Sequence, residues 1–167
     1  MIFDDARTRL RLFPDPALRL RAAEVVAFDH DLESLIARMV DTLSAYDGVG
    51  LAANQIGVLR RVALVRQADV VYVLVNPRLS SSSEETYVDD EACLSLPGVP
   101  VPVERPFAVA VQACDPKGQG LELALEGQAA RVVQHELDHL DGILIVDRVR
   151  ADARRRVLGD LRALVTR

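Results

Sequence analysis

The stretch His135-Glu136-Leu137-Asp138-His139 lies within a pattern that predicts a helix over about residues 128–140. Histidines four residues apart on a helix point to the same side, so both imidazoles can bind one ion. Glu136 stands beside the first histidine, where it can act as general base and then general acid toward a water on that ion. The alternative is a histidine pair hydrogen-bonded in a core. Because two of the three histidines fall in this window, we interpret it as the metal site of a hydrolase and expect the third, His30, at the surface.

A catalytic site of this kind needs a third protein ligand beside the two histidines. No histidine follows His139 and no glutamate follows Glu136, so the downstream candidates are aspartates: Asp141, Asp147, Asp152 and Asp160. Upstream, Cys93 offers a thiolate, which is a strong ligand for soft or borderline ions. A lone cysteine is otherwise a small buried hydrophobe, and we interpret Cys114 in that way. We favour Cys93 as the third ligand, and a downstream aspartate remains the alternative.

Residues 48–57, Gly-Val-Gly-Leu-Ala-Ala-Asn-Gln-Ile-Gly, form a third distinctive segment. The glycines allow close approach of the backbone, but the Lys-Ser/Thr ending of a phosphate-binding loop is missing. Gln55 places a polar amide inside an apolar run. It is either a hydrogen-bonded buried amide or a donor aimed at an oxyanion that develops during a reaction. The residues alone leave both interpretations open.

The composition is typical of a globular protein. The chain has 167 residues, of which 50% are hydrophobic, so it can bury a core without disulfides, and we expect one domain over residues 1–167. A net charge of -5 argues against sequence-specific nucleic-acid binding. The two cysteines are far apart, and we see neither a signal peptide nor an apolar stretch that could span a bilayer. We therefore expect a soluble, cytoplasmic protein without a membrane partner.

Hydrophobic periodicity predicts further elements along the chain. They are a helix over 29–46, strands over 61–65 and 70–75, a hairpin of 107–113 with 121–126, a short strand over 143–146 and an amphipathic helix over 150–165. The serines of 79–83 and the acids up to Asp90 indicate a solvated loop. Four prolines exclude a central strand between that loop and the hairpin: Pro97, Pro100, Pro102 and Pro106.

The last twenty residues are rich in arginine. Seven arginines stand there against two aspartates: Arg148, Arg150, Arg154, Arg155, Arg156, Arg162 and Arg167. An arginine-rich surface helix usually presents a solvated face, and the alternative is a contact with an acidic partner such as ribosomal RNA. The opposite face of this helix is predicted to turn inward, with Val157, Leu158, Leu161, Leu164 and Val165.

These segments, in their order, resemble the bacterial peptide deformylases. That family carries Gly-x-Gly-Leu-Ala-Ala-x-Gln, then Glu-Gly-Cys-Leu-Ser, then His-Glu-x-x-His. Here the three motifs are residues 48–55, Glu91-Ala-Cys-Leu-Ser95 and residues 135–139. The early Pro-Asp-Pro and the Asp-Gly after the second histidine are also similar. A single motif is of limited specificity, but the ordered set covers nearly the whole chain.

The resemblance implies an α+β fold, with small antiparallel sheets around a central metal-binding helix and an amphipathic C-terminal helix. It implies a metallo-amidohydrolase that removes the formyl group from the N-terminal formyl-methionine of newly made proteins and releases formate. It also implies one divalent ion, with Fe2+ as the natural ion and Zn2+, Ni2+ or Co2+ as ions that can occupy the purified protein.

The resemblance assigns roles by position. The metal ligands would be Cys93, His135 and His139. Glu136 would take the proton of the attacking water and pass it to the leaving amine. The side chain of Gln55 and the backbone N–H of Leu94 would hold the oxyanion. The cleft for the formyl-methionine end would be lined by Val49, Gly50 and Val132.

A few positions depart from the family pattern. Ala92 stands where the family usually has glycine, and its methyl group could crowd the peptide or disfavour a positive φ. Asn54 replaces a more usual proline or threonine, and we expect little effect. Other altered positions near the pocket are Asp89, Gln128 and Pro100. Two alternatives to an active deformylase stand. Ala92 motivates a catalytically weak deformylase-like protein, and the question of the third ligand leaves a metalloprotease of another family that uses Asp147 or Asp160.

Overall fold

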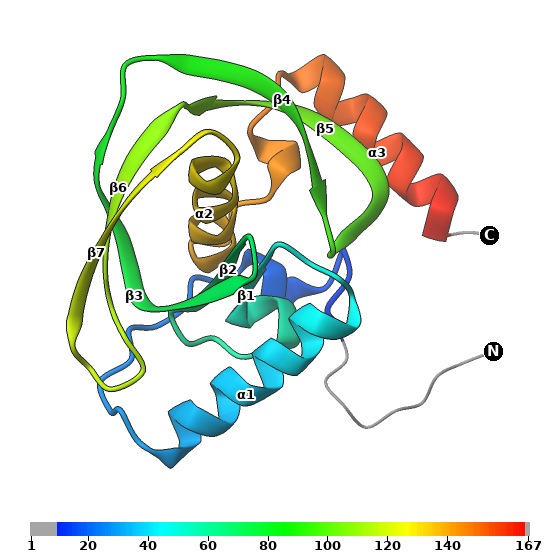
Figure 1. Ribbon diagram of the computed structural model, residues 1–167. Coiled ribbons are helices and arrows are strands. Elements are labelled where there is room, and N and C mark those ends of the chain that lie inside the picture. The colour runs from blue at the N-terminus through cyan, green and yellow to red at the C-terminus, as the bar shows by residue number, and fades with distance from the viewer. Residues whose placement is uncertain (1–9, 166–167) are drawn as a thin grey trace.

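Helix α2 (Gly127–Leu140) lies at the centre of the computed structural model, which describes residues 10–165 (Figure 1). Every residue from Ala130 to Leu140 is buried. The strands that curve around the helix are β1 (Gly50–Ala52), β2 (Val62–Gln67), β3 (Val70–Ser82), β4 (Thr86–Cys93), β5 (Leu96–Pro106), β6 (Ala108–Cys114) and β7 (Gly120–Glu126). Because a buried polar group is costly unless it is paired, the histidines and charges of α2 need partners from these strands.

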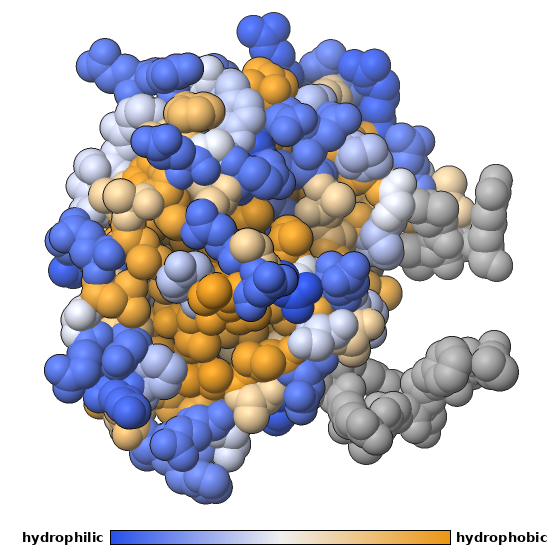
Figure 2. Space-filling view, viewed as in Figure 1, coloured by the Kyte–Doolittle hydropathy of each residue, from blue (hydrophilic) through white to orange (hydrophobic). Residues whose placement is uncertain are grey.

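The strands form two antiparallel sheets, one in the order β1-β2-β3-β6-β7 and one of β4 and β5 alone. The larger sheet packs on α2 through apolar side chains that include Val65, Leu74, Val111, Val133 and Leu137. The predicted hairpin of 107–113 with 121–126 is confirmed as β6 and β7. This arrangement is the α+β fold expected from the resemblance. The space-filling view shows the molecule from the same side as Figure 1. Apolar side chains gather near the middle of this face, with hydrophilic side chains around them (Figure 2).

Helix α1 (His30–Ala45) confirms the helix predicted over 29–46. The carboxylate of Asp29 accepts a hydrogen bond from the backbone N–H of Leu32 at 3.1 Å, which caps the first turn. The buried face of the helix joins β1 and β2 in one cluster that includes Leu32, Leu35, Met39, Leu43, Leu51 and Leu64. His30 lies at the surface, as predicted, with 89% of its side chain exposed.

Helix α3 (Ala151–Val165) confirms the predicted last helix and packs on β5. Val157 and Leu161 are buried in one cluster with residues of β5, and Leu158 packs against that cluster, as the inward face predicted. The side chains of Leu164 and Val165 lie outside the described part of the chain. The helix therefore covers the outer side of the β4–β5 pair (Figure 1).

The loop predicted over 79–83 is wrong, since β3 continues to Ser82 and β4 begins at Thr86. The tail of β3 pairs with β6 through two register shifts, and β6 satisfies backbone groups that a serine-rich pattern would leave to water. The proline-rich stretch is also a strand, β5, but among residues 10–165 it pairs with β4 alone, in a two-stranded sheet. The exclusion of a central strand there is therefore confirmed, because proline is tolerated at an edge.

The short strand predicted over 143–146 is wrong as well. A 3-10 helix occupies Ile145–Asp147, and the carboxylate of Asp147 accepts a hydrogen bond from the backbone N–H of Leu144 at 2.9 Å. An aspartate that bonds its own preceding backbone favours a turn over an extended strand.

Gly142 ends α2 and generates a prediction about stability. Its φ is +74°, and an added Cβ would meet the carbonyl oxygen of Arg19 at 2.5 Å. We therefore expect Gly142→Ala to lower the free energy of unfolding by about 1–3 kcal/mol, as measured in urea. Gly159→Ala is the matched control, because no described atom lies within 4 Å of an added Cβ there and alanine favours a helix. Equal stability of the two variants would contradict the prediction.

Candidate metal centre

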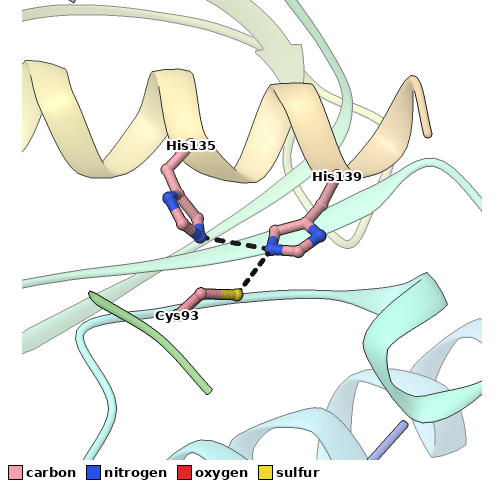
Figure 3. Close-up of side chains that lie close together, drawn as sticks. All are labelled: Cys93, His135 and His139. Atoms are coloured by element: carbon pink, nitrogen blue, oxygen red, sulfur yellow. Dashed lines mark hydrogen bonds between the residues drawn. The ribbon is translucent and has the colours of Figure 1, made fainter. Parts of the chain in front are cut away.

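Three ligand-type side chains converge between α2 and the end of β4 (Figure 3). His135 and His139 extend from successive turns of α2, and Cys93 faces them from the last position of β4. The Nε2 atom of His139 lies 3.2 Å from the Sγ atom of Cys93 and 3.1 Å from the Nε2 atom of His135. All three side chains are buried, and their ligand atoms lie within 4.8 Å of one another. The structure thus brings the three predicted ligands together.

The donor set fits a divalent ion. Two imidazole nitrogens and a thiol point at one another, an arrangement that a borderline-soft cation satisfies. Burial lowers the pKa of His139 well below its ordinary value, which leaves a neutral ring with a free lone pair. Burial also acts to lower the pKa of His135, but hydrogen bonds to Cys93 and Glu91 outweigh it, and the pKa is raised well above its ordinary value. The groups around His135 therefore stabilise positive charge at this position, whether a proton or a divalent ion carries it.

Glu91 orients the first histidine. Its Oε2 atom lies 2.9 Å from Nδ1 of His135, which places the proton on Nδ1 and leaves Nε2 facing the centre. Arg105 donates two further hydrogen bonds to the same carboxylate, at 2.8 and 3.0 Å, and Arg131 donates another at 2.9 Å. Burial acts to raise the pKa of Glu91, but the hydrogen bonds from His135 and Arg105 prevail and lower it to about 2. Glu91 is therefore anionic.

A second buried carboxylate, Asp138, lies on α2 between the two histidines. It accepts hydrogen bonds from Arg105 at 2.6 Å and from Arg148. Sequence reasoning missed Arg105, Arg131 and Asp138, because nothing in the local pattern distinguishes a buried charge from a solvated one. The adjacent position of Asp138 and His139 was the available signal.

Glu136 lies in the same cleft, and no arginine among residues 10–165 donates a hydrogen bond to its side chain. Its side chain is buried, and burial raises its pKa to about 7. Its Oε2 atom has no hydrogen-bond partner among residues 10–165. Gly50 is the residue that makes room for it, because an added Cβ would overlap the Oε1 atom of Glu136 and approach Val132 to 2.9 Å. The carboxyl group is thus placed to exchange a proton near neutral pH.

The amide of Gln55 has a defined orientation. Its Oε1 atom accepts a hydrogen bond from the backbone N–H of Ala52 at 2.8 Å, and its Nε2 atom donates one to Oγ of Ser95 at 3.1 Å. The same Nε2 atom lies 3.9 Å from Sγ of Cys93. The two interpretations of Gln55 are therefore compatible: it is a buried, hydrogen-bonded amide whose donor end borders the metal ligands.

A cleft of about 700 Å³ opens onto these groups. Every predicted site residue except His139 lines it: Val49, Gly50, Gln55, Cys93, Leu94, Val132, His135 and Glu136. Of the positions that depart from the family pattern, Ala92 and Gln128 line the cleft as well. The lining includes neither Asp89 nor Pro100.

Asn54 has a larger structural role than the little effect expected from its sequence position. Its side chain is fully buried, and its Nδ2 atom donates a hydrogen bond to the backbone carbonyl of His139. The amide therefore ties the segment before Gln55 to the end of α2 that carries a metal ligand.

A helical His-Glu-x-x-His pair completed by a cysteine from a β-hairpin defines a class of Cys-His-His metal proteins. The family model for polypeptide deformylase matches residues 8–155, and the chain belongs to this family. The peptide deformylase of Thermotoga petrophila is 45% identical over 141 residues, which cover 84% of this chain and 86% of the relative. Peptide deformylase 1 of Corynebacterium efficiens is 42% identical over 158 residues, which cover 92% of this chain and 94% of the relative.

Solved structures agree with the sequence relatives. The crystal structure of a peptide deformylase from Legionella pneumophila matches with a TM-score of 0.90 and 36% identity over 96% of both chains. The structure of the Thermotoga maritima peptide deformylase matches with a TM-score of 0.84 and 42% identity, over 87% of this chain and 99% of that one.

The geometry predicts that His139 is required for metal binding and that His30 is not. We expect the wild-type protein to bind one Co2+ ion with the visible absorption of a thiolate-containing site. His139→Ala should weaken binding by more than about 100-fold, since even a residue that merely supports a ligand contributes 10- to 100-fold. His30→Ala is the control and should match the wild type. Similar Co2+ affinity of all three proteins would refute the site.

Proposed function

We propose that this chain removes the formyl group from the N-terminal formyl-methionine of newly made proteins and releases formate. The main support is the buried carboxyl of Glu136, whose Oε2 atom has no hydrogen-bond partner among residues 10–165. It lies beside a Cys-His-His cluster in a protein of the deformylase family. A formamide is a poor electrophile, so its hydrolysis needs both an activated water and stabilisation of the developing oxyanion.

The proposed metal ligands are Cys93, His135 and His139, and a divalent ion bound by them would supply a Lewis acid and a more acidic water. We propose Fe2+ as the natural ion, from the resemblance. Zn2+, Ni2+ and Co2+ are alternatives, and a His2Cys set binds Zn2+ more tightly than Fe2+ by the usual affinity order.

Glu136 is the proposed general base and acid. Its pKa of about 7 means that the carboxyl can accept the proton of the attacking water at Oε2 and then return it to the leaving amine. The described part of the chain gives Glu136 no arginine hydrogen-bond partner. This matters here, since an ion pair of the kind that holds Glu91 would make Glu136 too weak a base.

The side chain of Gln55 and the backbone N–H of Leu94 are the proposed oxyanion donors. The bonds of the Gln55 amide to Ala52 and Ser95 hold its Nε2 end on the side of Cys93, so little reorganisation is needed as charge develops. The formyl-methionine end would lie along Val49 and Gly50, with its side chain against Val132.

The structure bears on both alternatives. Asp147 makes ion pairs with Arg19 and with Arg154 and does not join the ligand cluster, and Asp160 is exposed on α3. Ala92 motivated the catalytically weak alternative, but it is not among the positive-φ residues, so its methyl group creates no backbone strain. These observations favour an active deformylase.

The substrate determines the proposed location. Because newly made chains are the substrate, we propose that the enzyme acts in the cytoplasm, as a single domain over residues 1–167. Among residues 10–165, no helix is both long enough and apolar enough to cross a bilayer.

The decisive experiment is formate release from formyl-Met-Ala-Ser by protein purified without oxygen and loaded with Fe2+, Ni2+ or Zn2+. We expect multiple turnovers, with Fe2+ or Ni2+ more active than Zn2+. Glu136→Gln should lower kcat by about 10²- to 10⁴-fold, because it removes the proton acceptor but keeps the shape.

Glu33→Gln is the control, since Glu33 lies on the exposed face of α1, and it should keep wild-type activity. A metal-loaded wild-type protein that releases no formate would disprove the proposed function. Full activity in Glu136→Gln would disprove the role of Glu136 alone.

We further propose that α3 contacts ribosomal RNA, without sequence-specific recognition. Its exposed arginines, which include Arg154 and Arg155, contrast with the net charge of -5. We expect the protein to sediment with ribosomes at low salt and to dissociate as salt is raised. Arg154→Glu with Arg155→Glu should abolish sedimentation, whereas Arg21→Glu, remote in sequence and 81% exposed, should not. Unchanged sedimentation of the double variant would contradict the contact.

A further inference from the structure

Residues 10–13, which we call the N-terminal strap, run beside the two segments that carry the proposed oxyanion donors Gln55 and Leu94. The backbone N–H of Arg11 donates a hydrogen bond to the carbonyl of Gln55 at 2.6 Å, and that of Phe13 donates one to the carbonyl of Ser95 at 2.9 Å. Ser95 is also the residue whose hydroxyl accepts the Gln55 amide. The strap is therefore hydrogen-bonded to two segments of the cleft that are far apart in the sequence.

Apolar packing anchors both ends of the strap. Leu10 packs against the cluster formed by α1, β1 and β2, and Phe13 packs against the cluster that contains Cys93 and Leu96. Because these are separate clusters, the strap bridges them and holds a definite position relative to the metal ligands. The strap is therefore part of the cleft wall.

Two leucines of the strap face the cleft. Leu10 and Leu12 both line the cavity that contains His135 and Glu136, together with the apolar side chains of Leu94 and Pro97. Leu12 remains 49% exposed. A single exposed leucine needs no explanation, but this one is held by flanking backbone bonds on the wall of a reaction site.

The cleft is larger than one residue requires. Its volume of about 700 Å³ lies within the roughly 300–1,000 Å³ range of sites that bury drug-sized ligands. A formyl-methionine end fills part of this space, and the peptide that follows it must leave through the rest. The apolar wall of the strap is continuous with the reaction site, so the occupant that fits it is the next part of the same peptide.

We propose that Leu12 is a specificity-determining residue, which packs against an apolar side chain carried by the peptide within two residues after formyl-methionine. This inference rests on the proposed deformylase function and adds a preference to it. On the α2 side, the cleft carries the polar Gln128 and also Val132, which is assigned to the formyl-methionine side chain. The strap therefore supplies apolar surface for the residues that follow.

The test compares three peptides: formyl-Met-Ala-Ser, formyl-Met-Leu-Ser and formyl-Met-Ala-Leu. With the wild-type enzyme we expect a kcat/KM about three- to tenfold higher for at least one leucine peptide than for formyl-Met-Ala-Ser. This gain is smaller than a closed pocket gives, because Leu12 stays half exposed. Leu12→Ser should remove the preference, mainly through KM.

Leu20→Ser is the matched control. Leu20 is 50% exposed, follows the strap closely in sequence and does not line the cleft, so its loss should leave the preference intact. Leu12→Ala gives the same comparison with a smaller change in polarity, should the serine variant be unstable.

The outcomes separate this proposal from the function on which it rests. An active wild-type enzyme without a preference for either leucine peptide overturns the role of Leu12 and leaves the function standing. That role is also overturned if Leu12→Ser and Leu12→Ala keep the full preference. If no peptide yields formate with the metal-loaded wild-type enzyme, the proposed function fails and the role of Leu12 fails with it.

Discussion

The joint between α2 and the β4–β5 hairpin depends on charges buried between them. Glu91 and Arg105 belong to the hairpin, Arg131 and Asp138 belong to α2, and each carboxylate accepts hydrogen bonds from two arginines. Taking such charges out of water is costly, and removing one partner leaves another charge unpaired, at about 3–5 kcal/mol. Because Cys93 lies on the hairpin and both histidines lie on α2, this joint sets the distance between the metal ligands.

The same burial has opposite results at two neighbouring carboxyl groups. Arginine and histidine partners lower the pKa of Glu91 to about 2. Glu136 has no such hydrogen-bond partner among residues 10–165, and burial raises its pKa to about 7. One carboxylate is thereby anionic near neutral pH and orients a ligand, and the other is placed to exchange a proton. Partner placement, rather than residue type, separates the two roles.

Small residues and backbone contacts shape the space around these groups. Gly50 admits the carboxyl of Glu136, and the buried amide of Asn54 ties the Gln55 segment to the end of α2. The strap closes another part of the wall with two backbone hydrogen bonds. Four distant segments of the chain line the cleft, and its width reflects packing among all of them. They are residues 10–12, 46–55, 90–98 and 128–136.

The sequence by itself determined the local features: the spacing of His135 and His139, the hairpin of β6 and β7, and the amphipathic helices. These follow from periodicities and turn residues within a few positions of each other. The tertiary structure alone decided that β3 runs on to Ser82, where β6 supplies its partners, and that Arg105 is buried rather than solvated. It also decided that Leu12 faces the reaction site. Each of these features depends on contacts between residues far apart in sequence. A pattern of neighbouring residues does not show which of those contacts form.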